Sequence, residues 1–312
     1  MHTILSVMNL KKWSWSLVLL ELKKQLQSKY EIVCIIRDFR AGALDELTDF
    51  FDLILVQNVD SIKLFTKGKH KIVSRMGGTR TFDLSKTPFD DELKQVGAVI
   101  ATNEKLFEIG KRNNDNTFLL PNGIDLQLFE PRLQRQQPFD NNGSDPFVVG
   151  FSGNIDGEMC MNYKGWKYFV QATLRLRPSI TTKTMLYKHN QIPHDRMPED
   201  FYHQIDCLVL PSIDEGCSNV VMEALACGVP VLLTKVGFHG ERLEDNTNCL
   251  FIERDIDSIM SKITLLMKVP ELRAKLAFEG RLFAETNHDI DKIAQEYDRI
   301  FKLMLEGRKE CK

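Results

Sequence analysis

The sequence lacks the short motifs that mark most cofactor-dependent and nucleotide-hydrolysing enzymes. No G-x-G-x-x-G follows an apolar run, which argues against a nicotinamide or flavin cofactor. No G-x-x-x-x-G-K-[ST] is present, so hydrolysis of a nucleoside triphosphate has no support. The histidines show neither H-E-x-x-H nor another metal-ligand spacing. We therefore expect no metal and no organic cofactor.

Charge, cysteine usage and hydrophobic patterning argue against further classes. The formal net charge is −2, so no global basic field favours nucleic acid as a partner. The 7 cysteines are scattered without a C-x-x-C pair, as expected of a reduced chain with neither a zinc ribbon nor a disulfide framework. No apolar run reaches membrane-spanning length, and no cleavable signal is evident. These features predict a cytoplasmic protein.

What the sequence does contain is a regular alternation of apolar runs and helical stretches. In the first half, strands are predicted at 3–8, 31–36, 52–57, 71–75, 98–102 and 118–120, and helices at 13–27, 44–50 and 103–110. In the second half, strands are predicted at 147–151, 184–188, 206–210, 231–233 and 249–252, and helices at 164–176, 197–203, 240–245, 256–267, 271–283 and 290–305. This alternation predicts parallel strands with crossover helices, arranged as two Rossmann-like, doubly wound α/β domains.

A chain of 312 residues with 43% hydrophobic content suits two domains. A polar, Gln-rich segment over 130–146 marks the boundary between them. We predict an N-terminal domain over 1–130, a linker over 131–146, a second domain over 147–289, and a terminal helix over 290–312 that packs back on the first domain. Sheets of this kind bind ligands outside the carboxyl ends of their strands, so two such edges facing each other would form the binding cleft.

Residues 211–230 combine the parts of a binding site. An apolar run leads into a polar loop, which is followed by a short apolar helix. Glu215 lies in the loop and Glu223 on the helix, where a carboxylate in apolar surroundings is costly unless it is hydrogen-bonded. The helix is predicted to begin at Ser218 and Asn219, where the free backbone N–H groups favour an anion. The stretch therefore predicts a phosphate-binding loop with two carboxylates for hydroxyl groups.

Two positions earlier in the second domain strengthen this prediction. Gly153 follows the first strand, where the lack of a side chain permits close approach of a phosphate. Lys164 opens the next predicted helix, from which its ammonium group could reach a diphosphate. Taken singly, Gly153 would be a turn residue, Lys164 a surface cation, and Glu215 and Glu223 solvated acids. The functional interpretation depends on their combination.

The histidines and the first helix carry weaker signals. His189, His194 and His203 are interpreted as surface or rim residues, and His239 as part of a loop that could line the cleft. Trp13 belongs to a basic and aromatic start of the first helix, whose favoured interpretation is packing on the sheet. Contact with a membrane surface or a lipid-linked acceptor stays open as the alternative.

These residues resemble the retaining glycosyltransferases of family 4, which have the GT-B fold. Glu215 to Glu223 match the E-x7-E motif of that family, and residues 223–231 resemble its segment EAmAcGvPVv. Residues 121–125 followed by Phe129, residues 149–153 followed by Lys164-Gly165, and residues 197–211 resemble the family's segments PNGVD…F, GFVGR…KG and lp.fYn.aDvfvlPS. The resemblance is strongest over 121–253 and only topological before that.

The resemblance implies transfer of a sugar from a nucleotide-diphosphate donor to a glycan, lipid-linked or other acceptor, with retention of configuration, in a cleft between the two domains. It implies that Glu223 accepts hydrogen bonds from the ribose, that Glu215 holds the donor sugar, and that Lys164 neutralises the leaving diphosphate. The remaining donor-binding residues would be Gly153, Asn154, Gly216, Cys217, Ser218 and Asn219, and the acceptor side would include Arg75 and Trp13.

The chain departs from the family pattern at several places. The family usually has Arg where this chain has Asn154, which removes one of two expected phosphate cations. The loop over 154–164 is longer than usual, residues 9–15 replace a Gly-rich loop, and Arg75 lies where a histidine is frequent. A catalytically weak or inactive GT-B protein that binds a nucleotide sugar or a partner transferase is therefore an alternative. A GT-B epimerase is supported less, because E-x7-E is not its signature.

Overall fold

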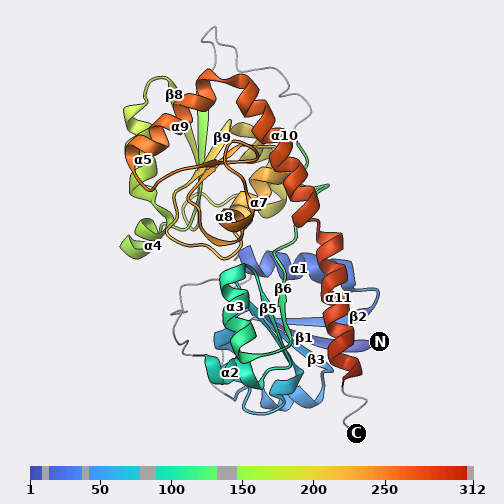
Figure 1. The fold of residues 1–312 in the computed structure, drawn as a ribbon. Helices are drawn as coiled ribbons and strands as arrows, with labels where there is room; N and C mark the ends of the chain where they lie inside the picture. The colour runs from blue at the N-terminus through green and yellow to red at the C-terminus, as the bar shows by residue number, and fades with distance from the viewer. Residues whose placement is uncertain (9–13, 37–41, 78–88, 132–145, 308–312) are drawn as a thin grey trace. The chain divides into compact units, whose positions relative to one another are not determined.

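The computed structural model describes residues 1–8, 14–36, 42–77, 89–131 and 146–307, which form two units (Figure 1). Unit 1 comprises Met1–Ile124 and His288–Lys312, and unit 2 comprises Asp125–Asn287. The units thus divide a few residues before the domain ends that were placed at 130 and 289. The terminal helix belongs to unit 1, and most of the predicted linker lies outside the described residues.

Unit 1 is built on a parallel sheet in the order β2-β1-β3-β4-β5-β6. Ile4 lies opposite Ile32 on one side and Leu53 on the other. The chain order reverses between β1 and β3, which is the mark of a doubly wound sheet. The strands are β1 (His2–Met8), β2 (Tyr30–Ile36), β3 (Leu53–Val56), β4 (Ile72–Met76), β5 (Ala98–Ala101) and β6 (Thr117–Leu119).

Helices cover both faces of this sheet (Figure 1). Ile4 packs in one core with α1 (Ser14–Leu26) and α11 (Ile290–Glu306), whereas Leu5 packs in a second core with α2 (Asp90–Gln95) and α3 (Glu104–Asn113). Successive side chains of a strand point to opposite faces, so a run without polar residues is buried on both. The 3-10 helices of unit 1 are Asp45–Asp49, Val59–Leu64 and Lys69–Lys71.

The segment after β6 is joined to the start of α11 by backbone hydrogen bonds. The amide of Ile124 donates to the His288 carbonyl at 2.7 Å, and the amide of Ile290 donates to the Ile124 carbonyl at 3.1 Å. A Cβ at Gly123 would lie 3.0 Å from Cα of Ile290, so glycine favours this close approach. The imidazole of His288, which is buried, donates from Nδ1 to the Asn122 carbonyl at 2.8 Å.

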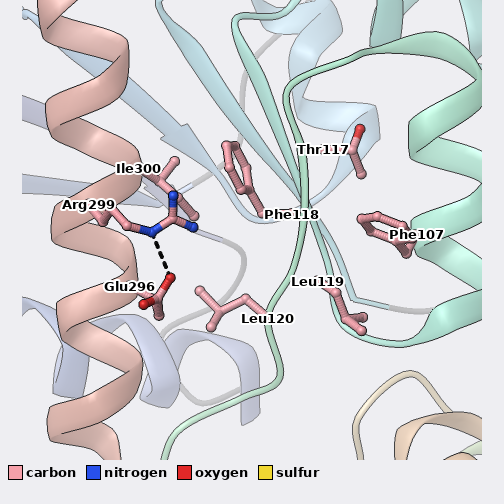
Figure 2. Close-up of a pocket in the computed structure, with 8 residues that line it drawn as sticks. All are labelled: Phe107, Thr117, Phe118, Leu119, Leu120, Glu296, Arg299 and Ile300. Atoms are coloured by element: carbon pink, nitrogen blue, oxygen red, sulfur yellow. Dashed lines mark hydrogen bonds and ion pairs between the residues drawn. The ribbon is translucent and has the colours of Figure 1, made fainter.

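A cavity of about 210 Å³ lies at the β6 edge of unit 1, between α3 and α11 (Figure 2). Arg299 covers the ring of Phe118 at 5.3 Å and pairs with Glu296 at 2.9 Å. The other lining residues are Phe107, Thr117, Leu119, Leu120 and Ile300. None of the residues predicted to bind donor or acceptor lines this cavity.

Unit 2 contains a parallel sheet in the order β11-β10-β9-β7-β8. Its chain order reverses between β7 and β9. Its strands are β7 (Phe147–Gly153), β8 (Ile180–Leu186), β9 (Cys207–Leu210), β10 (Val231–Leu233) and β11 (Leu250–Phe251). Its helices are α4 (Gly157–Lys164), α5 (Trp166–Arg175), α6 (Met197–Asp200), α7 (Asn219–Ala226), α8 (Gly237–Arg242), α9 (Ile256–Lys268) and α10 (Pro270–Asn287), and 3-10 turns lie at His194–Arg196 and Tyr202–Gln204. The predicted pair of doubly wound α/β domains is confirmed.

Two local predictions in unit 2 were wrong. The helix predicted over 164–176 is interrupted, because Gly165 adopts a left-handed conformation (φ 70°) that ends α4 at Lys164, and α5 begins at Trp166. The strand predicted over 184–188 begins earlier, at Ile180. It is the edge strand β8, whose threonines and lysine hid it from a search for apolar runs.

No helix within the described ranges is both long and apolar enough to cross a membrane.

The buried His288 predicts a pH dependence of unit 1. Burial lowers its pKa from 6.5 to about 4, and the hydrogen bond with Asn122 opposes this only in part. As the pH falls from 6.5 towards 4, the unfolded chain binds a proton that the folded chain excludes, so folding loses stability. We expect His288→Asn, which keeps an N–H donor but cannot titrate, to remove about 2–3 kcal/mol of this loss.

Denaturant unfolding of wild type and His288→Asn at pH 7 and pH 4.5 measures this difference. The prediction requires the wild type to lose more stability than the variant on acidification. Parallel pH dependence of the two proteins would show that His288 does not exclude the proton.

Candidate functional site

The predicted site residues of unit 2 lie at the carboxyl ends of β7 and β9. Gly153 is the last residue of β7, and Pro211 follows β9 directly. These two strands are neighbours in the sheet, and the chain order reverses between them. Ligands of doubly wound sheets bind in the crevice at such a reversal. The topology thus gives a physical reason for the position of the site.

Lys164 and Glu215 form an ion pair at this edge. Nζ of Lys164 lies 2.5 Å from Oε1 of Glu215, and the same oxygen accepts a hydrogen bond from Oγ of Ser212 at 2.7 Å. The side chains of Lys164 and Glu215 are 20% and 14% exposed. A charge-assisted hydrogen bond in so little solvent is strong and well oriented. The pair therefore places a cation and a carboxylate together at the carboxyl ends of the strands.

The glycine after Lys164 makes this approach possible. Gly165 ends α4 in a left-handed conformation, and a Cβ there would clash with the carbonyl oxygen of Pro211 and lie 2.7 Å from its Cγ. The chain after β9 is also linked to α4 by the amide of Ile213, which donates to the Tyr163 carbonyl at 2.9 Å. Because Gly165 has no side chain, the end of α4 can lie against the chain after β9, and this approach brings Lys164 to Glu215.

Glu223 lies on α7 and is 5% exposed. Its Oε2 accepts a hydrogen bond from the Tyr202 hydroxyl at 2.6 Å, and its Oε1 lies 3.1 Å from Nε2 of His194. Burial, and then the nearby Glu223, raise the pKa of Tyr202 well above its ordinary value, so its hydroxyl remains a donor. Phe129 packs on both partners, with ring centroids 5.1 Å from His194 and 6.1 Å from Tyr202. These contacts compensate the burial of the carboxylate and fix its orientation.

The loop between the two glutamates is held against the start of α8. The amide of Phe238 donates to the Gly216 carbonyl at 2.8 Å, and a Cβ at Gly237 would come 2.6 Å from that oxygen. Ser218 precedes α7 as its N-cap residue and Asn219 begins the helix, as predicted. Both are 7% exposed, and Cys217 is 5% exposed. No acidic residue lies in the first turn of α7, so its positive end remains suited to an anion.

The long loop after Asn154 contains α4. Oδ1 of Asn154 accepts a hydrogen bond from the amide of Asp156 at 2.9 Å, a common turn-forming contact. Asp156 also pairs with Lys188, which follows β8. Asn154 therefore shapes the entry into α4 with its oxygen, and it brings no charge to the end of β7.

The acceptor-side predictions lie in unit 1. Arg75 is 2% exposed on β4 and donates to Oδ1 of Asn122, and it also hydrogen-bonds Tyr297. These contacts give it a structural role within unit 1, and its contact with an acceptor stays a prediction. Trp13 lies outside the described residues.

The sequence interpretation missed three polar partners. Ser212 and Tyr202 have no predicted role, and His194 is predicted only as a surface or rim residue, whereas its side chain is 32% exposed and lies beside Glu223. The apolar sequence around Glu223 indicates that its carboxylate needs hydrogen-bond donors, but it does not indicate which residues provide them. The placement of His239 in a cleft-lining loop was wrong, because His239 belongs to α8 and is 2% exposed.

Part of the chain is similar to a family model and to a curated relative that are both described as glycosyltransferases. Residues 181–283 match the family model described as "Glycosyl transferases group 1". The capsular polysaccharide biosynthesis glycosyltransferase CapM of Staphylococcus aureus is 26% identical over 203 residues, which cover 59% of this chain and 53% of CapM. The chain thus spans about half the length of this curated relative.

Solved structures match nearly the whole chain. HepE of Anabaena, in complex with UDP-glucose, superposes with a TM-score of 0.76 at 15% identity, over 97% of this chain and 100% of HepE. A sucrose-phosphate synthase of Thermosynechococcus elongatus gives a TM-score of 0.77 at 15% identity, over 98% of this chain and 100% of the synthase. At such identities the likeness shows the fold alone, and it confirms the predicted GT-B fold.

The two left-handed glycines of α4 allow a matched test of the close approach at Pro211. Gly157 and Gly165 have φ of 77° and 70°, but a Cβ at Gly157 would meet nothing within 4 Å. We expect Gly157→Ala to cost about 1 kcal/mol from backbone strain alone. Gly165→Ala should cost about 3 kcal/mol, because the clash with Pro211 adds to the strain. Equal losses in denaturant unfolding would show that the approach is not tight.

Proposed function

We propose that this chain transfers a sugar from a nucleoside-diphosphate donor to an acceptor hydroxyl, with retention of configuration. The observation that carries the proposal is the meeting of Lys164 with Glu215 where β7 and β9 end. The match of residues 181–283 to group 1 glycosyltransferases supports the reaction class. Retention is inferred from the resemblance to family 4.

The donor would bind unit 2 with its diphosphate between Lys164 and the first turn of α7. An ammonium group and the backbone N–H groups of a helix N-terminus are both suited to phosphate oxygens. The solved complex of HepE contains UDP-glucose, which makes UDP-sugars the first donors to test.

Glu223 would hold the ribose. Both of its oxygens already accept a hydrogen bond, from Tyr202 and from His194. Each carboxylate oxygen has a second lone pair, so ribose hydroxyls can bind without displacing these partners. A carboxylate held in this way loses little further freedom on binding, which favours affinity.

Glu215 and Lys164 would act at the reacting end of the donor. The bond between the anomeric carbon and the phosphate oxygen breaks, and the electron pair leaves with the nucleoside diphosphate. Lys164 would stabilise this developing charge, while Glu215 orients the donor sugar through its hydroxyls. The acceptor oxygen bonds to the anomeric carbon on the face that the phosphate leaves, and its proton passes to the departing phosphate.

The alternative is a catalytically weak or inactive GT-B protein that binds a nucleotide sugar or a partner transferase. It is favoured by one observation, that neutral Asn154 lies at the end of β7 and contributes its oxygen to a turn. Donor binding would then persist through α7 and Glu223, while transfer would be slow for want of a second cation.

Release of free nucleoside diphosphate from UDP-, GDP- and ADP-sugars tests the proposed reaction. We expect the wild type to hydrolyse at least one donor slowly. Glu215→Gln keeps the size of the side chain but removes its charge, and it should lower kcat on the order of 100-fold. Glu271→Gln, on the exposed first turn of α10, is the matched control and should match the wild type. Undiminished turnover in Glu215→Gln would contradict the assignment of Glu215 to the active site. If no donor binds or is hydrolysed, the proposal that the protein is an enzyme fails.

The variant Asn154→Arg tests whether a missing cation makes the protein catalytically weak, as the alternative proposes. If the missing cation limits the rate, this variant should raise kcat of donor hydrolysis roughly tenfold or more, because a preorganised charge acts on the leaving diphosphate. Asn154→Gln controls for loss of the turn contact with Asp156 and should not raise kcat. An unchanged or lower rate in Asn154→Arg would show that charge at this position is not limiting.

A further inference from the structure

Arg254 connects three separate segments of unit 2. Its Nε donates to the Pro211 carbonyl at 3.1 Å. Its Nη2 donates to the backbone oxygen of Asn162 and, at 3.1 Å, to Oδ1 of the same residue. Its guanidinium carbon lies 4.8 Å from the centre of the Tyr168 ring. One side chain thus joins the end of α4, the chain after β9 and α5.

The backbone of Arg254 is itself held by the start of α9. Asp255 is the N-cap residue of that helix, and its Oδ1 accepts a hydrogen bond from the Ser258 amide at 2.8 Å. The amide of Glu253 donates to Oγ of Ser258 at 2.9 Å. The residues on both sides of Arg254 are therefore hydrogen-bonded to the first turn of α9, which restricts the backbone position of the arginine.

The acceptors of Arg254 lie next to the proposed catalytic pair in the chain. Asn162 belongs to the last turn of α4, which ends at Lys164. Pro211 directly precedes Ser212, whose hydroxyl donates to Glu215. A cation at the end of a helix also interacts favourably with the exposed carbonyls there. The separation of Asn162 and Pro211, set by one guanidinium group, therefore helps to set the position of Lys164 against Glu215.

We propose that Arg254 is a positioning residue for glycosyl transfer, which acts by joining the segment that carries Lys164 to the segment that carries Glu215. This inference rests on the proposed function of that pair. A planar guanidinium can donate in two directions while stacking on Tyr168, whereas the ammonium group of a lysine cannot reproduce this geometry. The role therefore requires arginine.

The test compares Arg254→Ala and Arg254→Lys with a control arginine. Arg273 also lies over an aromatic ring, that of Phe147 at 5.7 Å, and it donates to the Leu266 carbonyl at 2.8 Å. For donor hydrolysis, we expect Arg254→Ala to lower kcat roughly tenfold to 100-fold, with KM changed less than about threefold, because misplaced groups cost rate rather than affinity. Arg254→Lys should recover little of the loss, and Arg273→Ala should keep kcat within about twofold of wild type.

A double-mutant cycle tests whether Arg254 acts through Lys164. In a Lys164→Gln background, Arg254→Ala should lower kcat by less than about twofold, because the group that it positions is already gone. If the double variant lost kcat by the product of the two single losses, the two residues would act independently and the proposal would fail. It would also fail if kcat of Arg254→Ala stayed within twofold of wild type.

Amide hydrogen exchange provides a readout that does not depend on activity. We expect faster exchange over 157–165 and 211–215 in Arg254→Ala, and no change there in Arg273→Ala. Unchanged exchange in Arg254→Ala would overturn the positioning role. If the wild type hydrolyses no donor but Arg254→Ala shows the expected faster exchange, the proposed function fails and the positioning role of Arg254 stands.

Discussion

The ion pair between Lys164 and Glu215 is the interaction on which the candidate site depends. It joins the end of α4 to the loop after β9, and it requires the backbone of Gly165 to lie against Pro211. The reversal of chain order between β7 and β9 creates the crevice, and the pair places opposite charges beside it. A short, weakly solvated ion pair is sensitive to geometry. The contacts of Ser212 and Arg254 matter because they hold the residues around this pair in place.

Glu223 represents a second and different use of a carboxylate. It is nearly buried, and Tyr202 and His194 each bond one of its oxygens, so its burial is compensated within unit 2. Glu215 faces the ammonium group of Lys164, whereas Glu223 faces the hydroxyl group of Tyr202 and the imidazole ring of His194. The pair of Lys164 and Glu215 thus suits the reacting end of the donor, where the diphosphate meets the sugar, and Glu223 suits the uncharged hydroxyl groups of the ribose.

Much of the fold was predictable from sequence, because the strands of unit 1 and unit 2 are apolar runs separated by helical stretches. The edge strand β8 was misplaced since one of its sides is not covered by another strand, and its polar residues broke the apolar pattern. The place of Glu215 and Glu223 around a helix start was also readable. The partners of Glu223 were not, because Tyr202 and His194 approach it through tertiary packing that no local pattern encodes. Similarly, the close approach of Gly165 to Pro211 could not be predicted, because Pro211 lies far along the chain.

A crystal structure of this protein with UDP would show whether the donor nucleotide binds at the ends of β7 and β9. We expect the diphosphate within hydrogen-bonding distance of Nζ of Lys164 and of the first amides of α7, with the ribose hydroxyls on the carboxylate of Glu223. A nucleotide bound away from the ends of β7 and β9, or a ribose that does not contact Glu223, would contradict it.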